Sequence, residues 1–175
     1  MTAHPLLAEA EEARALAHPL AQSEARTRAP YLLFRVATQW LACPAGQVEA
    51  ILELQPATPV PRTAPHVLGL VGHGDSPLAV LDAARLLGLD RPEAGLDDLS
   101  LRRIVVVRAA GLRAGLVCER AAGVIELADS ERLAPSVLLG PRLERFVAAE
   151  AERAQGRVGL LDLDALLLWV KQGTA

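Results

Sequence analysis

The chain has 175 residues, of which 51% are hydrophobic and only 3% aromatic, and its formal net charge is −3. A chain of this length can bury a core without disulfides or metals, and this core must be built from Leu, Val, Ile and Ala rather than from stacked rings. The sequence has no basic stripe and hardly any aromatic side chains on which bases could stack, so we expect no nucleic-acid partner.

The first 29 residues are rich in Ala, Glu and Arg, and their apolar residues recur every three or four positions. This spacing predicts a short amphipathic helix that Pro19 interrupts. We expect residues 1–29 to form an N-terminal extension, partly helical or flexible, ahead of a single domain over residues 30–172. The extension has acidic residues where a signal peptide needs a basic start, so we expect a cytoplasmic protein without direct membrane insertion.

From Tyr31 onward, short apolar runs alternate with Pro, Gly and charged clusters, a rhythm typical of an all-β domain with few short helices. We expect ten strands, at residues 31–37, 40–43, 48–54, 67–72, 77–81, 103–109, 112–118, 123–127, 145–151 and 157–162. Ten short strands favour a barrel or paired barrels over an α/β fold. The segment Gln55–Pro65 contains four prolines, which cannot donate to a strand ladder, so we expect an extended surface connection there.

The stretch Gly69–Asp82, "GLVGHGDSPLAVLD", sets glycines, a histidine and an aspartate between two apolar runs. We interpret it as a hairpin with a loop of four or five residues, in which Gly72 and Gly74 take positive φ and Asp75 is a turn residue. A phosphate-binding loop would need a helix directly after the glycines, whereas Pro77 and a strand follow.

Two helices are expected. Residues 82–89 offer Asp82 as an N-cap and end at Gly88, and residues 162–172 have acidic residues in the first turn and Lys171 near the end. Between them, the polar segment 90–100 carries four acidic residues. We expect this segment to be an exposed crossing between two halves of the domain, within a connection over residues 83–102.

Ten aliphatic residues are assigned to the core by default, although some of them could instead line a groove that receives an apolar helix tip: Val48, Ile51, Leu52, Leu68, Leu70, Val80, Val105, Val107, Leu116 and Val124. The two cysteines, Cys43 and Cys118, lie in apolar segments outside any metal-ligand spacing, so we interpret them as buried thiols.

His66, His73 and Asp75 are of types that bind zinc or non-haem iron. His66 is expected on the far side of a strand from His73, and no third His or Glu completes the set. A small metal- or ligand-binding β-barrel protein that uses these three residues is therefore kept as the alternative. No Ser or Cys lies in a nucleophile motif, so we predict no catalytic residue, metal site or cofactor.

Four segments, taken in order, resemble the CheW family, the adaptor domains of bacterial chemosensory arrays: "CPAGQVEAILELQPATPVPRTAPHVLGLV", "PLAVLDAARLLGL", "RIVVVRAAGLRAGLVCERAAGVIEL" and "GRVGLLDLDALL". The resemblance runs from about Tyr31 to Leu168. Its most specific parts are the Pro-rich segment leading to Val67–Val71, the strand end Val80–Asp82 with Arg85 and Leu86 after it, and the terminal Leu160–Leu166 stretch.

The resemblance implies two interlocked five-stranded SH3-like β-barrels around an aliphatic core. It also implies a non-catalytic adaptor that joins chemoreceptor tips to the regulatory domain of a CheA-type histidine kinase. Eleven residues are the expected partner-binding set: Val48, Ile51, Leu68, Val71, Gly72, His73, Gly74, Asp75, Val80, Asp82 and Arg85.

The sequence departs from the family pattern at one informative place. Where the family usually has an Asn-x-Arg-Gly turn, this chain has Gly72–Asp75, so the basic side chain becomes Gly and the Gly becomes Asp. The usual acidic residue after Val48 falls on Ala50, and the usual Asp of the second barrel falls on Glu119. Replacing Arg by Gly removes any bidentate bond to a partner carboxylate. We therefore expect an altered partner set, as in a variant pathway such as pilus motility or surface sensing.

Overall fold

The structure is a computed structural model that describes residues 28–91, 99–136 and 139–173. In chain order the elements are β1 (Arg28–Val36), β2 (Gln39–Pro44), η1 (Ala45–Gln47), β3 (Val48–Glu53), β4 (Val67–His73), β5 (Ser76–Asp82), α2 (Ala83–Leu87), η2 (Leu99–Leu101), β6 (Arg103–Ala109), β7 (Leu112–Cys118), β8 (Arg120–Ala128), η3 (Asp129–Glu131), α3 (Pro141–Glu144), β9 (Val147–Arg153), β10 (Gly156–Leu161) and α4 (Leu163–Lys171). The expected N-terminal helix lies outside the described residues.

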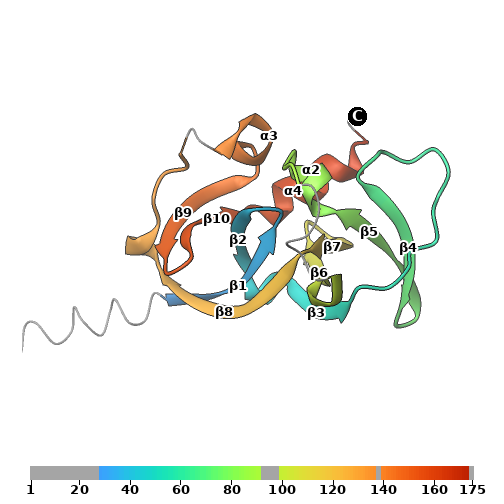
Figure 1. The fold of residues 1–175 in the computed structure, drawn as a ribbon, viewed down its shortest axis with the longest axis horizontal. Coiled ribbons are helices and arrows are strands. Elements are labelled where there is room, and N and C mark those ends of the chain that lie inside the picture. Colours follow the sequence, from blue (N-terminus) through green and yellow to red (C-terminus); the bar gives the residue numbers. More distant parts are fainter. Residues whose placement is uncertain (1–27, 92–98, 137–138, 174–175) are drawn as a thin grey trace, which may run out of the picture.

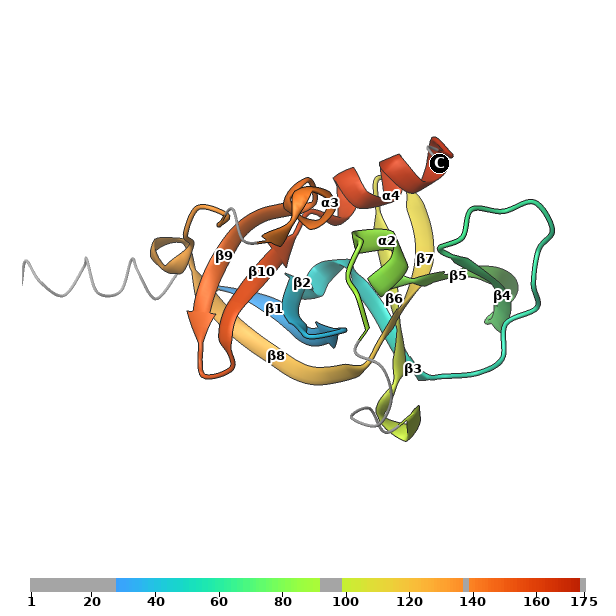
Figure 2. The same cartoon turned by 45° about the horizontal axis from the view of Figure 1, so that its top comes forward.

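The ten strands form two five-stranded sheets, which confirms the all-β prediction. The first barrel has the strand order β8-β1-β2-β10-β9, and the second has the order β3-β6-β7-β5-β4. Each contains one parallel pair, β2 with β10 and β5 with β7, among antiparallel neighbours. The two curled sheets lie side by side, and α2 and α4 lie over their junction (Figures 1 and 2).

The connection over residues 83–102 does not cross between the halves, so that prediction is wrong. The strands on either side of it, β5 and β6, belong to the same sheet. The chain instead passes from the first barrel to the second through η1, and it returns between β7 and β8. Polar composition indicates an exposed connection, but it carries no information about which sheet the next strand joins.

Strand β1 shows why these sequences form paired barrels. Tyr31 and Leu33 point into the interior of the first barrel, whereas Leu32, Phe34 and Val36 point to the opposite side, into a core shared by both sheets. Side chains alternate between the faces of a strand, so a strand buried on both faces needs a continuous apolar run. The run "YLLF" meets that requirement.

Strand β6 repeats the arrangement in the second barrel. Ile104 and Val106 fill the interior of that barrel, while Val105 and Val107 pack into the shared core. Both expected buried thiols are fully covered in the shared core. Desolvation by this burial raises the pKa of each thiol to about 12, so both stay protonated near neutral pH.

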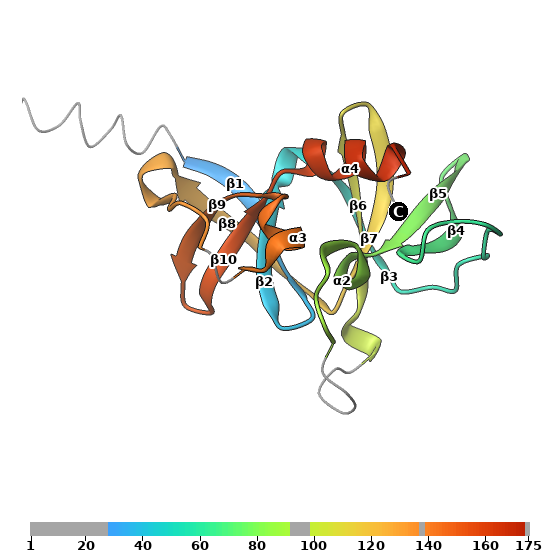
Figure 3. The same cartoon turned by 90° about the horizontal axis from the view of Figure 1, so that it is seen from above.

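The two expected helices cover the junction of the barrels (Figure 3). Asp82 caps α2 by accepting the Arg85 backbone N–H at 3.2 Å, and α2 ends at Gly88 in the left-handed conformation. Asp162 caps α4 in the same way through the Ala165 N–H at 3.0 Å. The sequence did not indicate α3 or the three short 3₁₀ turns, because runs of three or four residues carry no periodicity.

Three of the ten residues assigned to the core are exposed. The side chains of Ile51, Leu70 and Val124 keep 45%, 37% and 60% of their accessible surface. They lie on β3, β4 and β8, which are edge strands of the two sheets. An edge strand has one face turned to solvent, and the alternation in sequence does not say which apolar face that is.

The Pro-rich segment is an extended connection, and it also pairs with a strand. Thr58 exchanges two backbone hydrogen bonds with Leu70 of β4, at 2.8 and 2.9 Å. The neighbouring Gly69 has φ +141°, and a Cβ placed there would lie 2.2 Å from the Thr58 carbonyl oxygen. Only glycine permits this close approach of two backbones.

Replacing Gly69 by Ala should therefore destabilise the protein by about 2 to 4 kcal/mol, because the new Cβ meets backbone and the residue is strained at positive φ. The matched control is Gly72→Ala on the same strand, where a Cβ would meet nothing within 4 Å; we expect a change within about 0.5 kcal/mol. Urea unfolding followed by circular dichroism measures both. Equal effects of the two variants would refute the role given to the Thr58 contact.

Candidate partner-binding surface

The turn between β4 and β5 is tighter than the sequence indicated. The strands end at His73 and start again at Ser76, so the turn has two residues rather than four or five. Only Gly74 has positive φ, at +65°, and Gly72 lies within β4 without that requirement. A glycine at the first central position is typical of the type II′ turn of tight hairpins. Gly72, Gly74 and Asp75 are exposed at this tip.

A set of apolar side chains lies exposed along β3, the Pro-rich segment and β4. We call this set the β3–β4 patch; its members are Ile51, Leu54, Val60 and Leu70, each at least 37% exposed. All four belong to consecutive elements of the second barrel, and β3 and β4 are the two edges of its sheet. Exposed aliphatic side chains on edge strands are candidates for contact with another protein.

The remaining expected site residues are distributed between the surface and the interior. Val48 and Leu68 are half-buried and pack against the cores. Val71 and Val80 are 5% and 1% exposed and fill the interior of the second barrel, so they shape the surface from beneath. Arg85 is exposed on α2.

Asp82 belongs to a buried charge network that sequence reasoning missed. Arg91 donates from Nη1 to Asp82 Oδ2 and from Nε to Glu119 Oε1, each at 2.7 Å. Glu119 Oε2 in turn accepts the Ala37 backbone N–H at 2.6 Å. Ala37 lies in the turn between β1 and β2, so this network joins the end of β5 in one barrel to a turn of the other. Nine residues separate Arg91 from Asp82, and no periodic pattern relates them.

The network sets the protonation of Asp82. Burial by itself raises the pKa of this carboxyl, but the hydrogen bonds from Arg91 and from the Arg85 backbone outweigh that effect and hold the pKa below its ordinary value of 3.8. Asp82 is therefore ionised near neutral pH. Because the folded-state pKa is depressed, the stabilisation is present above the unfolded-state value and is lost as the pH falls through the folded-state value.

A second contact between the barrels comes from Asp164 in the first turn of α4. Its Oδ1 accepts the Ala110 backbone N–H at 2.7 Å, in the turn between β6 and β7, and its Oδ2 accepts from Gln47 Nε2 of η1 at 3.0 Å. Ala110 has φ +49°, so this hydrogen bond supports a turn that an alanine adopts at some cost.

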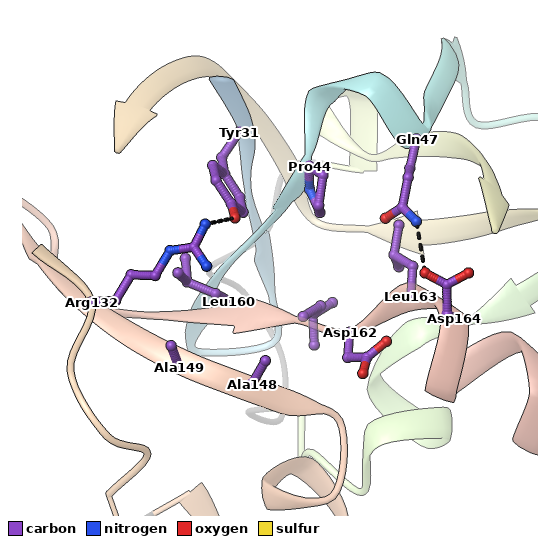
Figure 4. A pocket seen from close by; sticks show the side chains of 11 residues that line it. Tyr31, Pro44, Gln47, Arg132, Ala148, Ala149, Leu160, Asp162, Leu163 and Asp164 are labelled. Carbon is purple, nitrogen blue, oxygen red and sulfur yellow. Dashed lines mark hydrogen bonds between the residues drawn. The ribbon is translucent and has the colours of Figure 1, made fainter. Parts of the chain in front are cut away.

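A hollow of about 220 Å³ opens beside this contact (Figure 4). Tyr31, whose hydroxyl accepts from Arg132 Nη2 at 2.7 Å, lies toward one end of it, and Gln47 with Asp164 lies toward the other. Ala148 and Ala149 of β9 line part of the wall with little bulk. The hollow can therefore receive an apolar side chain from outside.

Glu49 of β3 is paired with two arginines of the same barrel. It receives a hydrogen bond from Arg113 Nε at 2.6 Å and another from Arg108, on the two neighbouring strands β7 and β6. The hydrogen bond from Arg113, followed by that from Arg108, holds the pKa of Glu49 below its usual range. The Glu49 carboxylate is thus paired within the chain itself.

The metal alternative gains no support. His66 is 8% exposed and packs against Trp169, with the ring centroids 5.7 Å apart, while His73 and Asp75 lie at the opposite end of β4. Within residues 28–91, 99–136 and 139–173, no group of three or more His, Cys, Asp or Glu side chains could hold a metal ion. Among the same residues, no helix is long and apolar enough to span a membrane.

Comparisons with known proteins agree on one family. The family model described as the CheW-like domain matches residues 30–171. Protein FrzA of Myxococcus xanthus is 28% identical over 151 residues, which are 86% of this chain and 92% of FrzA. The chemotaxis protein CheW of Thermotoga maritima is 25% identical over 100 residues, which are 57% of this chain and 63% of that protein, less than two thirds of its length.

A solved structure shows the same fold. The scaffolding protein TtCheW from Thermoanaerobacter tengcongensis superposes with a TM-score of 0.68, over 79% of this chain and 91% of that one, at 18% sequence identity. At this identity the likeness speaks for the fold alone.

Replacing Arg91 by Gln should cost about 3 kcal/mol of stability near neutral pH, because two buried carboxylates lose their counter-charge. The matched control is Arg85→Gln, which removes an exposed guanidinium 3.6 Å from the same Asp82 and should cost less than about 1 kcal/mol. Chemical unfolding at several pH values measures both. The difference between wild type and Arg91→Gln should shrink below pH 3.8, and a difference that is the same at all pH values would contradict the assignment.

Proposed function

Because the chain belongs to the CheW-like domain family, we propose that it is a non-catalytic cytoplasmic adaptor that couples chemoreceptor tips to the regulatory domain of a CheA-type histidine kinase. The observation that carries this proposal is the family match over residues 30–171, which covers both barrels of the described structure. No bond is made or broken in this function. The adaptor holds two partners in a fixed geometry, so that a change in one biases the other.

The second barrel is the proposed docking face for the kinase. The β3–β4 patch supplies apolar contact area, and the tip Gly72–Asp75 lies at the end of the same hairpin. Apolar side chains at the centre of an interface and polar groups at its rim are the usual arrangement of specific protein contacts. A rigid barrel beneath the patch reduces the entropy lost on binding.

The junction of the barrels is the proposed docking face for the receptor tip. A coiled-coil tip presents apolar side chains at helical spacing, and such helices bind by inserting these side chains into grooves. The hollow beside Tyr31, Pro44 and Gln47 supplies a receiving site of about 220 Å³. Single contacts of this size are weak, and an array offsets the weakness through multiple simultaneous attachments.

The altered tip supports a specialised partner set within this function. Gly74 stands where the family usually has Arg, and Ala50 stands where the family usually has an acidic residue. Neither position offers the charge-assisted bonds of a general chemotaxis adaptor. We propose that the chain serves a variant pathway, such as pilus motility or surface sensing.

The kinase face is tested by Ile51→Asp and Leu70→Asp, each of which places a charge in the β3–β4 patch. Each should weaken binding to a purified CheA-type regulatory domain at least about tenfold, because a buried unpaired charge is costly. Val124→Asp is the matched control, since Val124 is 60% exposed on the other barrel, and it should leave the affinity unchanged. Calorimetric titration measures all three, and equal affinity of the patch variants and wild type would refute the assigned face.

The specialisation is tested by comparing the purified regulatory domains of all CheA-type kinases from the source organism. One kinase of a variant pathway should bind at least about tenfold more tightly than the general chemotaxis kinase. Kinase activity in the presence of receptor should then depend on the adaptor only in that pair. If the general chemotaxis kinase binds as tightly as any other, the specialisation is wrong while the adaptor function stands.

A further inference from the structure

A second cavity, distinct from the hollow beside Tyr31, lies beside the helices α2 and α4, and its lining includes Arg85 of the expected partner-binding set. It occupies about 430 Å³ between the end of the Pro-rich segment, the C-terminal end of α2, α3 and α4. Its size falls within the range of small-molecule sites. Nine residues line it: Ala64, Pro65, His66, Arg85, Gly88, Leu89, Asp90, Arg142 and Trp169.

Two arginines converge on this cavity from different helices. Arg85 of α2 donates from Nη1 to the Pro65 carbonyl at 3.3 Å, and Arg142 of α3 donates from Nη1 to the Arg85 carbonyl at 3.3 Å. A guanidinium has five N–H donors, so each arginine is anchored to backbone through one of them and can still donate to a ligand. Both side chains therefore have a backbone contact that directs them toward the cavity.

Gly88 explains how Arg142 reaches this position. The glycine ends α2 at φ +68°, and a Cβ at that site would lie 3.2 Å from both Cβ and Cδ of Arg142. The arginine stem therefore lies across the bare end of α2. The position of Arg142 therefore depends on Gly88, because any larger residue at position 88 would displace the Arg142 side chain.

The two arginines that line the cavity favour an anionic group. Arg85 and Arg142 are the positive charges of the lining and Asp90 is its negative charge, while Arg85 Nε also lies 3.6 Å from Asp82 Oδ2, which Arg91 contacts more closely at 2.7 Å. His66 adds no charge near neutral pH, because burial, assisted by the nearby Arg142, lowers its pKa. The two guanidinium groups match a carboxylate, whose planar shape fits the guanidinium fork.

The rest of the lining is apolar and aromatic. The Trp169 ring contacts the His66 ring and the Phe146 ring, each at a centroid distance of 5.7 Å. Pro65 and Leu89 continue the apolar wall. A tryptophan fixed in this way offers a rigid surface for a flat or aliphatic group.

We propose that this cavity, the Arg85–Arg142 cavity, binds a carboxylate carried on an apolar body. The carboxylate bonds to the two guanidinium groups, and the apolar body packs on Trp169, Pro65 and Leu89. The same chemistry occurs in a free aryl or alkyl carboxylic acid and in the apolar C-terminal residue of a peptide. The inference does not rest on the adaptor function, because binding is a property of the chain by itself.

Trp169 lines the cavity, so its fluorescence can be used to measure ligand binding. The chain has two tryptophans, so a Trp40→Phe variant leaves Trp169 as the only one, and its fluorescence reports occupancy. The probes are 3-phenylpropionate, as a free acid, and N-acetylphenylalanine, as a peptide end. Each is compared with its neutral amide, which keeps the apolar body and removes the charge. Calorimetry on the wild-type chain repeats the titrations without any substitution.

At least one acid should bind with saturation and at least about tenfold more tightly than its amide. Arg85→Gln and Arg142→Gln should each weaken that binding about tenfold, the usual effect of losing a charge-assisted hydrogen bond. Arg132→Gln, at the other hollow, should have no effect. Which acid binds identifies the source of the carboxylate. Failure of both acids at millimolar concentration, equal binding of the amides, or indifference to both arginine variants would overturn the proposal.

Discussion

The aliphatic core shared by the two sheets is the contact on which the rest of the molecule depends. Strands β1 and β6 bury both of their faces, one inside their own barrel and one against the opposite barrel. In an isolated barrel, the face of these strands that packs in the shared core would be exposed to water. Each apolar side chain exposed there would lose about 2 kcal/mol of burial free energy. The helices α2 and α4 cover the remaining edge of the same core. The two barrels therefore form one folding unit.

Charged groups refine this packing without replacing it. Arg91 joins Asp82 at the end of β5 to Glu119 between β7 and β8, and Asp164 joins α4 to the turn at Ala110. Both contacts hold a segment of one barrel against a segment of the other. A buried ion pair contributes little over an apolar pair of the same shape, but losing one partner is costly. We infer that these groups fix the relative orientation of the barrels.

A fixed orientation is what an adaptor requires. In the proposed function, the β3–β4 patch and the hollow beside Tyr31 bind different partners, and information passes only if the two faces keep a constant relation. Residues on the binding surfaces can then differ without a change in the orientation of the two barrels. The Gly72–Asp75 tip carries no Arg or Lys, and the Arg85–Arg142 cavity carries charge at a third place on the same frame.

The sequence by itself determined the ten strands, the N-cap at Asp82 and the family, because alternation, capping and spacing are local properties of the chain. Only the tertiary structure decided that residues 83–102 return to the same sheet, that Ile51 is exposed, and that Arg91 meets Glu119. These facts depend on which segments meet after folding. Alternation separates two faces of a strand, but the neighbouring sheet decides which face is covered.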